Sequence, residues 1–162
     1  MDRKDEHHLS SKHPYVFRIQ DFNQQVLALQ NNTLIATPHS DHVTPVILES
    51  MPCRAKEYLV RDKGTAIYLG IQKKELCLFC EESGGQPTLK LQSNNVMALY
   101  SSENAQKPFV FYQNQADSTS TFESAAYPGW FMCTSNEKDR PITMTQNGGT
   151  KYNTVFSLTS VS

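Results

Sequence analysis

The sequence has almost no excess of charge of either sign. Its 162 residues carry 15 Lys and Arg against 16 Asp and Glu, which gives a formal net charge of −1. A protein dedicated to binding nucleic acid needs a strongly basic surface, so this balance argues against that class. Long apolar runs are absent too, because the early run at residues 26–29 is far shorter than the roughly 20 residues of a membrane-spanning helix. We therefore expect a soluble, monomeric single domain with no nucleic-acid partner and no membrane insertion.

The N-terminal residues do not have the features of a secretory signal peptide. Residues 1–8 are charged and polar, and no apolar stretch follows them. A signal peptide needs such a stretch before its cleavage site. The sequence therefore predicts synthesis in the cytoplasm.

Cysteine is scarce, with four scattered residues: Cys53, Cys77, Cys80 and Cys133. They are too few for a disulfide framework, so we expect free thiols. Cys77 and Cys80 have the spacing of a redox or zinc motif, but they fall in an alternating strand, where residues three apart point to opposite faces. No second such pair completes a set of four metal ligands, and we predict no metal site.

Motifs for catalysis are missing as well. The sequence has no Gly-x-Ser-x-Gly elbow to expose a nucleophile, and Gly84-Gly85 is not followed by the Gly-Lys-Ser/Thr of a phosphate loop. We therefore expect no enzyme activity and no cofactor.

What the sequence does contain is period-two alternation of apolar and polar residues. Residues 1–14 lack periodicity and are expected to form a flexible tail or prosegment before a domain at 15–162. One short helix is expected at 95–100, capped by Asn94 or Asn95. Twelve short strands are predicted, at residues 15–19, 26–30, 33–37, 46–51, 66–71, 76–80, 88–92, 109–113, 119–124, 130–134, 142–145 and 155–159.

Three segments share the form of a hairpin followed by one more strand. The hairpins are predicted at residues 26–37, 67–80 and 130–145. Three such units can close a six-stranded barrel capped by three hairpins, so the prediction is an all-β protein with the β-trefoil fold. A two-sheet sandwich fits the strand count but not the threefold recurrence. The expected core residues are Leu69, Leu78, Leu89, Phe111, Phe122 and Phe156.

A rigid barrel of this kind would use its loops to bind another protein. The longest loops are expected at residues 54–63, 93–107 and 146–153. Tyr58 and Tyr152 are the strongest candidates for contact, because an exposed Tyr offers a large contact area with little entropy to lose.

Four segments carry a resemblance to a known family. They are residues 67–72 (Ile-Tyr-Leu-Gly-Ile-Gln), 76–80 (Leu-Cys-Leu-Phe-Cys), 86–91 (Gln-Pro-Thr-Leu-Lys-Leu) and 122–131 (Phe-Glu-Ser-Ala-Ala-Tyr-Pro-Gly-Trp-Phe). Together they resemble the interleukin-1 cytokine family and, within it, the interleukin-36 branch. Residues 21–26, 43–46 and 152–154 resemble the gamma-like agonists of that branch. The chain departs from the agonists at Leu27, where they commonly have Trp, and at residues 132–134, which look more like the antagonist and interleukin-37 members.

The resemblance implies a β-trefoil with no catalysis and no cofactor, exported without a signal peptide. It implies binding to the cell-surface interleukin-36 receptor and recruitment of the interleukin-1 receptor accessory protein, which starts pro-inflammatory signalling through NF-kappa-B and MAP kinases. The short connection at 146–153 resembles the agonists, and an antagonist of the same branch is the alternative. A trefoil lectin or protease inhibitor is the rival from another class. By loop position and family usage, the expected receptor contacts are Arg54, Tyr58, Gln146, Lys151 and Tyr152.

The resemblance also implies a processing site. Ile19-Gln20-Asp21 resembles the Ala-x-Asp motif of the family, with Ile in place of Ala, and agonists become fully active when trimmed nine residues before it. Cleavage between Leu9 and Ser10 would then remove residues 1–9 and make Ser10 the new N-terminus. The alternative is an inert tail whose length has no effect.

Overall fold

The computed structural model describes residues 13–60, 62–146 and 151–161. Strands dominate, as the period-two alternation predicts. They are β1 (Tyr15–Asp21), β2 (Gln25–Gln30), β3 (Thr33–Pro38), β4 (Leu48–Pro52), β5 (Thr65–Ile71), β6 (Leu76–Ser83), β7 (Gln86–Ser93), β8 (Val110–Ala116), β9 (Thr119–Ser124), β10 (Phe131–Ser135), β11 (Arg140–Pro141), β12 (Thr143–Thr145), β13 (Tyr152–Asn153) and β14 (Phe156–Ser160). The helical elements are η1 (Lys56–Tyr58), α2 (Val96–Ser101) and η2 (Lys107–Phe109).

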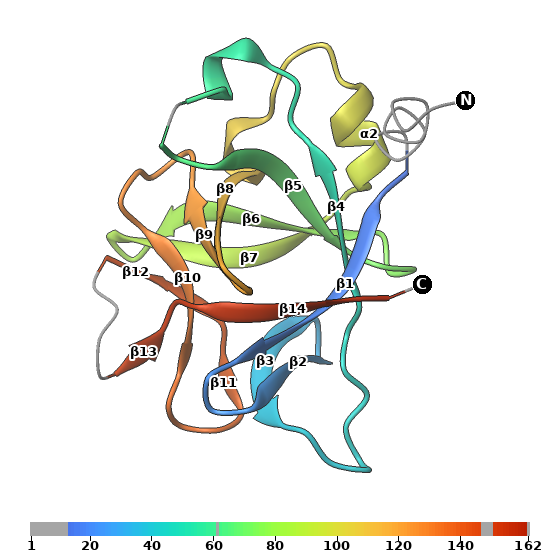
Figure 1. Ribbon diagram of the computed structural model, residues 1–162, viewed down its shortest axis with the longest axis vertical. Helices are drawn as coiled ribbons and strands as arrows, with labels where there is room; N and C mark the ends of the chain where they lie inside the picture. The colour runs from blue at the N-terminus through green and yellow to red at the C-terminus, as the bar shows by residue number, and fades with distance from the viewer. Residues whose placement is uncertain (1–12, 61, 147–150, 162) are drawn as a thin grey trace.

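Six strands close into an antiparallel barrel. β1 pairs with β14 and β4, β4 with β5, β5 with β8, β8 with β9, and β9 with β14. Six of the other strands form three hairpins that cap the barrel: β2 with β3, β6 with β7, and β10 with β12 (Figure 1). The short strands β11 and β13 pair with β3 and β10. The predicted β-trefoil is therefore confirmed. All twelve predicted strands are present, β9 with the predicted bounds and the other eleven with shifted ends, and the two-residue strands β11 and β13 were not predicted.

The second hairpin was placed wrongly from the sequence. The prediction paired 66–71 with 76–80, but β5 and β6 share only the pairs Gly70↔Cys77 and Ile71↔Leu76. β6 instead forms eight pairs with β7, around a turn at Gly84 and Gly85 that both have positive φ. The reason is that β5 belongs to the barrel, where β4 and β8 occupy its two edges.

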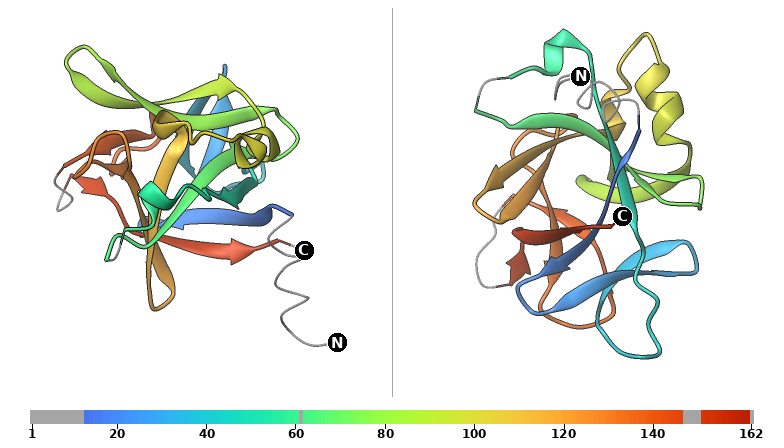
Figure 2. Two further views of the ribbon diagram at one scale, coloured as in Figure 1. Left: turned by 90° about the horizontal axis from the view of Figure 1, so that it is seen from above. Right: turned by 45° about the vertical axis from the view of Figure 1, so that its right-hand side comes forward.

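Alternating residues of the strands belong to two apolar clusters, one inside the barrel and one outside it. In β5, Ile67, Leu69 and Ile71 point into the barrel, whereas Ala66 and Tyr68 point outward into a second cluster. This second cluster includes residues of η1, α2 and η2, which explains why β5 is buried on both faces. α2 covers this outer surface (Figure 2). Asn95 is its N-cap, and the Asn95 side-chain oxygen accepts the N–H of Met97 at 2.8 Å, as the predicted cap requires.

Five of the six predicted core residues are fully buried, and they are Leu69, Leu78, Phe111, Phe122 and Phe156. Leu89 is half-buried, because β7 lies on the outer edge of its hairpin and packs against the core from one side only. Cys77 belongs to the outer cluster and Cys80 to the barrel cluster, so the two sulfurs point apart as predicted. Over the described residues, no helix has the length and apolar character needed to cross a membrane.

Candidate functional site

A surface hollow of about 630 Å³ lies on the third hairpin. We call it the hairpin hollow. Its lining residues are Ser135, Asn136, Glu137, Arg140, Pro141, Thr143, Lys151 and Tyr152. Two of the predicted receptor contacts, Lys151 and Tyr152, therefore lie in one site.

The short strand β13 positions these two residues. Its Tyr152 lies opposite Ser135 and its Asn153 opposite Thr134, at the end of β10. Lys151 is exposed and Tyr152 is half-buried, so the ammonium group and part of the phenol ring face solvent. Gln146 is exposed just after β12, and the rest of the predicted loop, residues 147–150, lies outside the described residues.

The hairpin hollow carries charges of both signs. Arg140 forms an ion pair with Glu137, and both side chains are more than 60% exposed. An ion pair in this setting contributes little to stability because water screens it. Tyr and Arg are enriched at protein–protein interfaces, and the hairpin hollow presents one of each, Tyr152 and Arg140.

Arg54 lies in a different hollow, formed mainly by the segment that carries α2. We call it the helix hollow; it measures about 150 Å³ and is lined by Arg54, Ala55, Tyr68, Leu99, Tyr100, Ser102, Glu103 and Ala105. The Arg54 guanidinium lies 4.3 Å from the centre of the Tyr100 ring and donates to the Tyr100 carbonyl oxygen at 2.8 Å. Arg54 is thereby held on the surface of α2.

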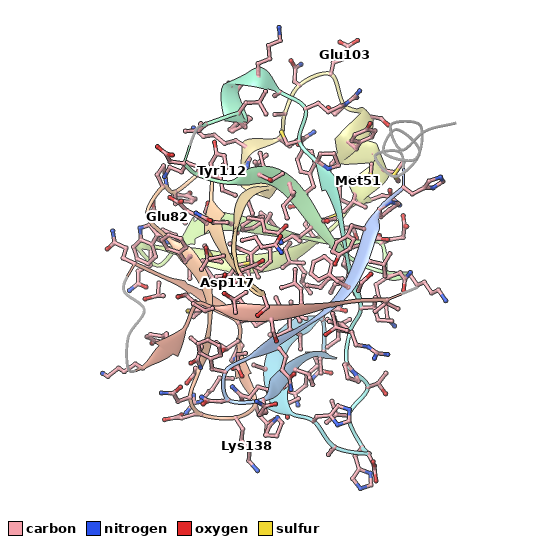
Figure 3. The ribbon with its side chains drawn as sticks, viewed as in Figure 1. Met51, Glu82, Glu103, Tyr112, Asp117 and Lys138 are labelled. Atoms are coloured by element: carbon pink, nitrogen blue, oxygen red, sulfur yellow. The ribbon has the colours of Figure 1, made fainter. Side chains whose placement is uncertain are left out.

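The structure does not gather the predicted contacts on one face. Glu103 marks the helix hollow at one end of the molecule, and Lys138 marks the β10–β11 connection at the other end (Figure 3). Arg54 thus belongs to one end, and Lys151 and Tyr152 to the other. The two hollows lie on different elements, the helix hollow beside α2 and the hairpin hollow on the third capping hairpin.

The expectation that Tyr58 is exposed is wrong. Its side chain is 8% exposed and belongs to the outer cluster, where η1 turns it toward Cys53 and Tyr112. The apolar body of Tyr58 is what fixes the 54–63 loop on the barrel. The next two residues, Leu59 and Val60, are 69% and 40% exposed. Sequence reasoning missed them, because apolar side chains such as Leu and Val are expected in the core.

The exposed aromatic residue Phe22 was also missed. It is 64% exposed in the turn between β1 and β2. Its neighbour Asn23 donates from its side-chain amide to Asn136 Oδ1 at 2.8 Å, which ties this turn to the rim of the hairpin hollow. An aromatic residue in a polar turn was the signal that could have identified it.

The proposed processing motif is part of the barrel. Ile19 is 3% exposed and Asp21 is 4% exposed, both within β1. Gln20 is half-buried beside them. Leu9 and Ser10, between which cleavage is predicted, lie outside the described residues.

The segment at 122–131 that carries the strongest resemblance forms a tightly bonded turn. Glu123 Oε2 accepts the N–H of Gly129 at 2.7 Å, and Ser124 Oγ accepts the N–H of Tyr127 at 3.0 Å. Gly129 has φ +89°, a conformation that other residues adopt only with strain. These hydrogen bonds and the positive φ of Gly129 account for the residue types of the segment as requirements of its backbone conformation.

The cysteines are unsuited to nucleophilic chemistry. All four are buried free thiols. Burial raises the pKa of Cys77 to about 12 and that of Cys133 to about 12, so both stay protonated at neutral pH. Within the described part of the chain, no three His, Cys, Asp or Glu side chains are grouped to hold a metal ion.

Comparison with known proteins identifies relatives over nearly the whole fold. The Interleukin-1 / 18 family profile matches residues 37–158. Human (Homo sapiens) interleukin-36 alpha is 45% identical over 87% of this chain and 89% of its own length, and mouse (Mus musculus) interleukin-36 beta is 42% identical over 94% and 84%. The mouse interleukin-36 receptor antagonist protein is 41% identical over 80% and 81%. Among solved structures, the NMR structure of interleukin-36alpha aligns with a TM-score of 0.79 and 42% identity over 93% of this chain and 96% of that one.

Proposed function

We propose, given that this chain belongs to the interleukin-1 family and to its interleukin-36 branch, that it is an agonist of the interleukin-36 receptor. Its relatives are cytokines and not enzymes, and the chain is likewise not an enzyme. In the proposed mechanism the protein binds the receptor at the cell surface and then recruits the interleukin-1 receptor accessory protein. Assembly of the three chains starts pro-inflammatory signalling through NF-kappa-B and MAP kinases. The observation that carries the proposal is the similarity to interleukin-36 alpha across almost the entire trefoil.

Similarity alone does not separate an agonist from an antagonist, because both kinds of relative match. The positions at which this chain departs from agonists are informative. Leu27 is 2% exposed, and Met132 and Cys133 are fully buried. These departures lie in the core and involve no exposed side chain. The agonist proposal is supported by the short connection at 146–153, which resembles the agonists.

The proposed receptor contacts follow the two hollows. Lys151 and Tyr152 contact the receptor from the hairpin hollow together with Gln146, and Arg54 contacts it from the helix hollow. Tyr58 is buried, so its role is to hold the 54–63 loop in place, and we do not propose a direct contact for it.

We further propose that the protein acts outside the cell after export without a signal peptide. Trimming between Leu9 and Ser10, counted from Ile19-Gln20-Asp21, completes its activation. The fixed position of Asp21 in β1 supports counting from that residue.

A binding experiment tests the receptor assignment. The chain starting at Ser10 is measured against the immobilised interleukin-36 receptor ectodomain, alone and with the accessory protein, alongside a cell reporter for NF-kappa-B. An agonist binds the receptor, retains the accessory protein and activates the reporter. Binding without retention of the accessory protein would identify an antagonist, and no binding to the receptor would reject the proposed function.

A variant locates the contact surface. The double substitution Lys151→Ala with Tyr152→Ala is expected to weaken binding about tenfold or more, because truncating a buried aromatic anchor typically costs 2 kcal/mol or more. Lys74→Ala is the control, since Lys74 is exposed in the turn between β5 and β6 and should leave affinity unchanged. Equal affinity of the double variant and the control would show that the hairpin hollow is not part of the receptor interface.

A further inference from the structure

Asp21 is a buried carboxylate with an unusually complete set of hydrogen bonds. Oδ1 accepts the backbone N–H groups of Asn23 at 2.8 Å and Gln25 at 2.9 Å. Oδ2 accepts the side-chain amide of Gln25 at 2.9 Å and the hydroxyl of Thr134 at 2.6 Å. Among the described residues no Lys or Arg forms an ion pair with it. Neutral donors alone therefore stabilise this carboxylate away from water.

These bonds join segments that lie far apart in the sequence. Thr134 is on β10, 113 residues after Asp21. The Gln25 amide that donates to Asp21 also donates to the carbonyl oxygen of Ser135 at 2.9 Å. The end of β1 and the start of β2 thus hold two successive residues of β10.

The same two residues of β10 carry β13. Thr134 lies opposite Asn153 and Ser135 opposite Tyr152. The Asn153 side-chain amide lies 3.4 Å from Thr134 Oγ1, a long contact that extends the network toward the surface. The Asp21 carboxylate is therefore linked to β13 through two contacts, one with Thr134 and one between Thr134 and Asn153, the residue next to Tyr152.

We infer that Asp21 is a positioning residue for the hairpin hollow. Its carboxylate holds Thr134 directly and Ser135 through Gln25, and this fixes the strand against which β13 presents Tyr152. The inference deepens the proposed function, on which its receptor-binding consequence rests. It also gives the Asp of the Ile19-Gln20-Asp21 motif a role in folding the receptor-facing surface. Because Asp21 is buried, a protease cannot contact its side chain in the folded protein.

Two substitutions of Thr134 test the inference with matched shapes. Thr134→Val keeps the shape and removes the hydroxyl, whereas Thr134→Ser keeps the hydroxyl. Affinity for the receptor ectodomain is measured at a temperature where circular dichroism shows all variants folded. Thr134→Val should bind about tenfold more weakly, since a hydrogen bond to a charged group is lost, and Thr134→Ser should bind as the parent does.

A double-mutant cycle of Thr134→Val with Tyr152→Ala shows whether Thr134→Val weakens receptor binding by displacing Tyr152 or by a general effect on the fold. If Asp21 acts through Tyr152, Thr134→Val causes little further loss in a chain that already lacks the Tyr152 side chain. Fully additive losses, or equal binding by the Val variant and the parent, would overturn the inference.

Hydrogen exchange without receptor keeps the inference separate from the proposed function. In Thr134→Val the amide of Tyr152 should exchange about tenfold faster than in the parent, while the amide of Leu69 in the barrel keeps its rate. Unchanged exchange at Tyr152 overturns the inference even if the receptor binds. Faster exchange supports it even if the parent chain fails to bind the receptor. Should Thr134→Val not fold, Asp21→Asn takes its place, because the amide nitrogen cannot accept the Thr134 and Gln25 donors.

Discussion

Lys63 and Glu123 form an ion pair between the 54–63 loop and strand β9, 60 residues apart in the chain. Lys63 Nζ lies 2.7 Å from Glu123 Oε2, and the same oxygen accepts the N–H of Gly129. The Glu123 side chain is 10% exposed and that of Lys63 is 36% exposed. The pair therefore ties the end of the 54–63 loop to the turn between β9 and β10, in a setting that water screens only partly.

Glu123→Ala should lower the free energy of unfolding by about 1–3 kcal/mol. The substitution leaves the Gly129 N–H and the Lys63 ammonium without their acceptor, and an unsatisfied partly buried group costs about this much. Urea unfolding at pH 7 measures it. Glu81→Ala is the matched control, because the Glu81–Lys90 pair is 45% and 43% exposed and should contribute less than about 1 kcal/mol. Equal effects of the two substitutions would contradict this prediction.

Leu69→Ala should destabilise the protein by about 2–5 kcal/mol, because the side chain is fully buried in the barrel and its loss leaves a cavity. Leu89→Ala should cost clearly less, since Leu89 is half-buried and water can reach the space it vacates. Thermal unfolding of both variants provides the comparison. A loss for Leu89→Ala as large as that for Leu69→Ala would show that β7 is more deeply packed than described.

The four cysteines should resist alkylation in the native protein. All are buried, and burial keeps Cys77 and Cys133 protonated at pH 8, whereas the thiolate is the form that reacts. Mass spectrometry after iodoacetamide treatment without reductant should show no label on the folded chain and four labels after denaturation. Fewer than four labels on the denatured, unreduced chain would reveal a disulfide.

Stability should fall at alkaline pH. Burial raises the pKa of Cys77 and Cys133 from the ordinary value of 9.0 to about 12, and it also raises the pKa of Tyr68. Between these values the folded state binds more protons than the unfolded state, so the contribution is fully present below pH 9 and is lost as pH rises toward 12. Unfolding free energies measured at pH 7, 9 and 10.5 should decrease over the last interval. In Cys133→Ala the decrease should be smaller than in the parent, and an identical slope would assign the effect to other groups.

Potency should depend sharply on the N-terminal residue. Chains that start at Met1, Leu9, Ser10 and Ser11 are compared in the receptor reporter assay, and the maximum is expected at Ser10. A charged leader near the receptor costs ordering entropy, whereas a defined terminus can be captured by the partner. Equal potency of the four chains would support an inert tail.

Local sequence determined the strands, the turns and the helix cap. Period-two alternation identified all twelve longer strands, and the predicted hairpin at 26–37 is present, with its turn at Asn31 and Asn32, both at positive φ. Such features depend on neighbouring residues alone, since the alternation reflects the pleat and the turn reflects backbone conformation. The family resemblance of residues 122–131 likewise comes from residue identities in one contiguous segment of the sequence.

Tertiary packing decided which strands pair and which side chains face the partner. β6 pairs extensively with β7 because the barrel occupies both edges of β5, and no local pattern encodes that competition. Tyr58 is buried because the outer cluster accepts it, although its neighbours are polar or exposed. The Lys63–Glu123 and Asp21–Thr134 contacts span 60 and 113 residues. Contacts at such separations follow from how the closed barrel places its loops, which the order of residues along the chain does not reveal.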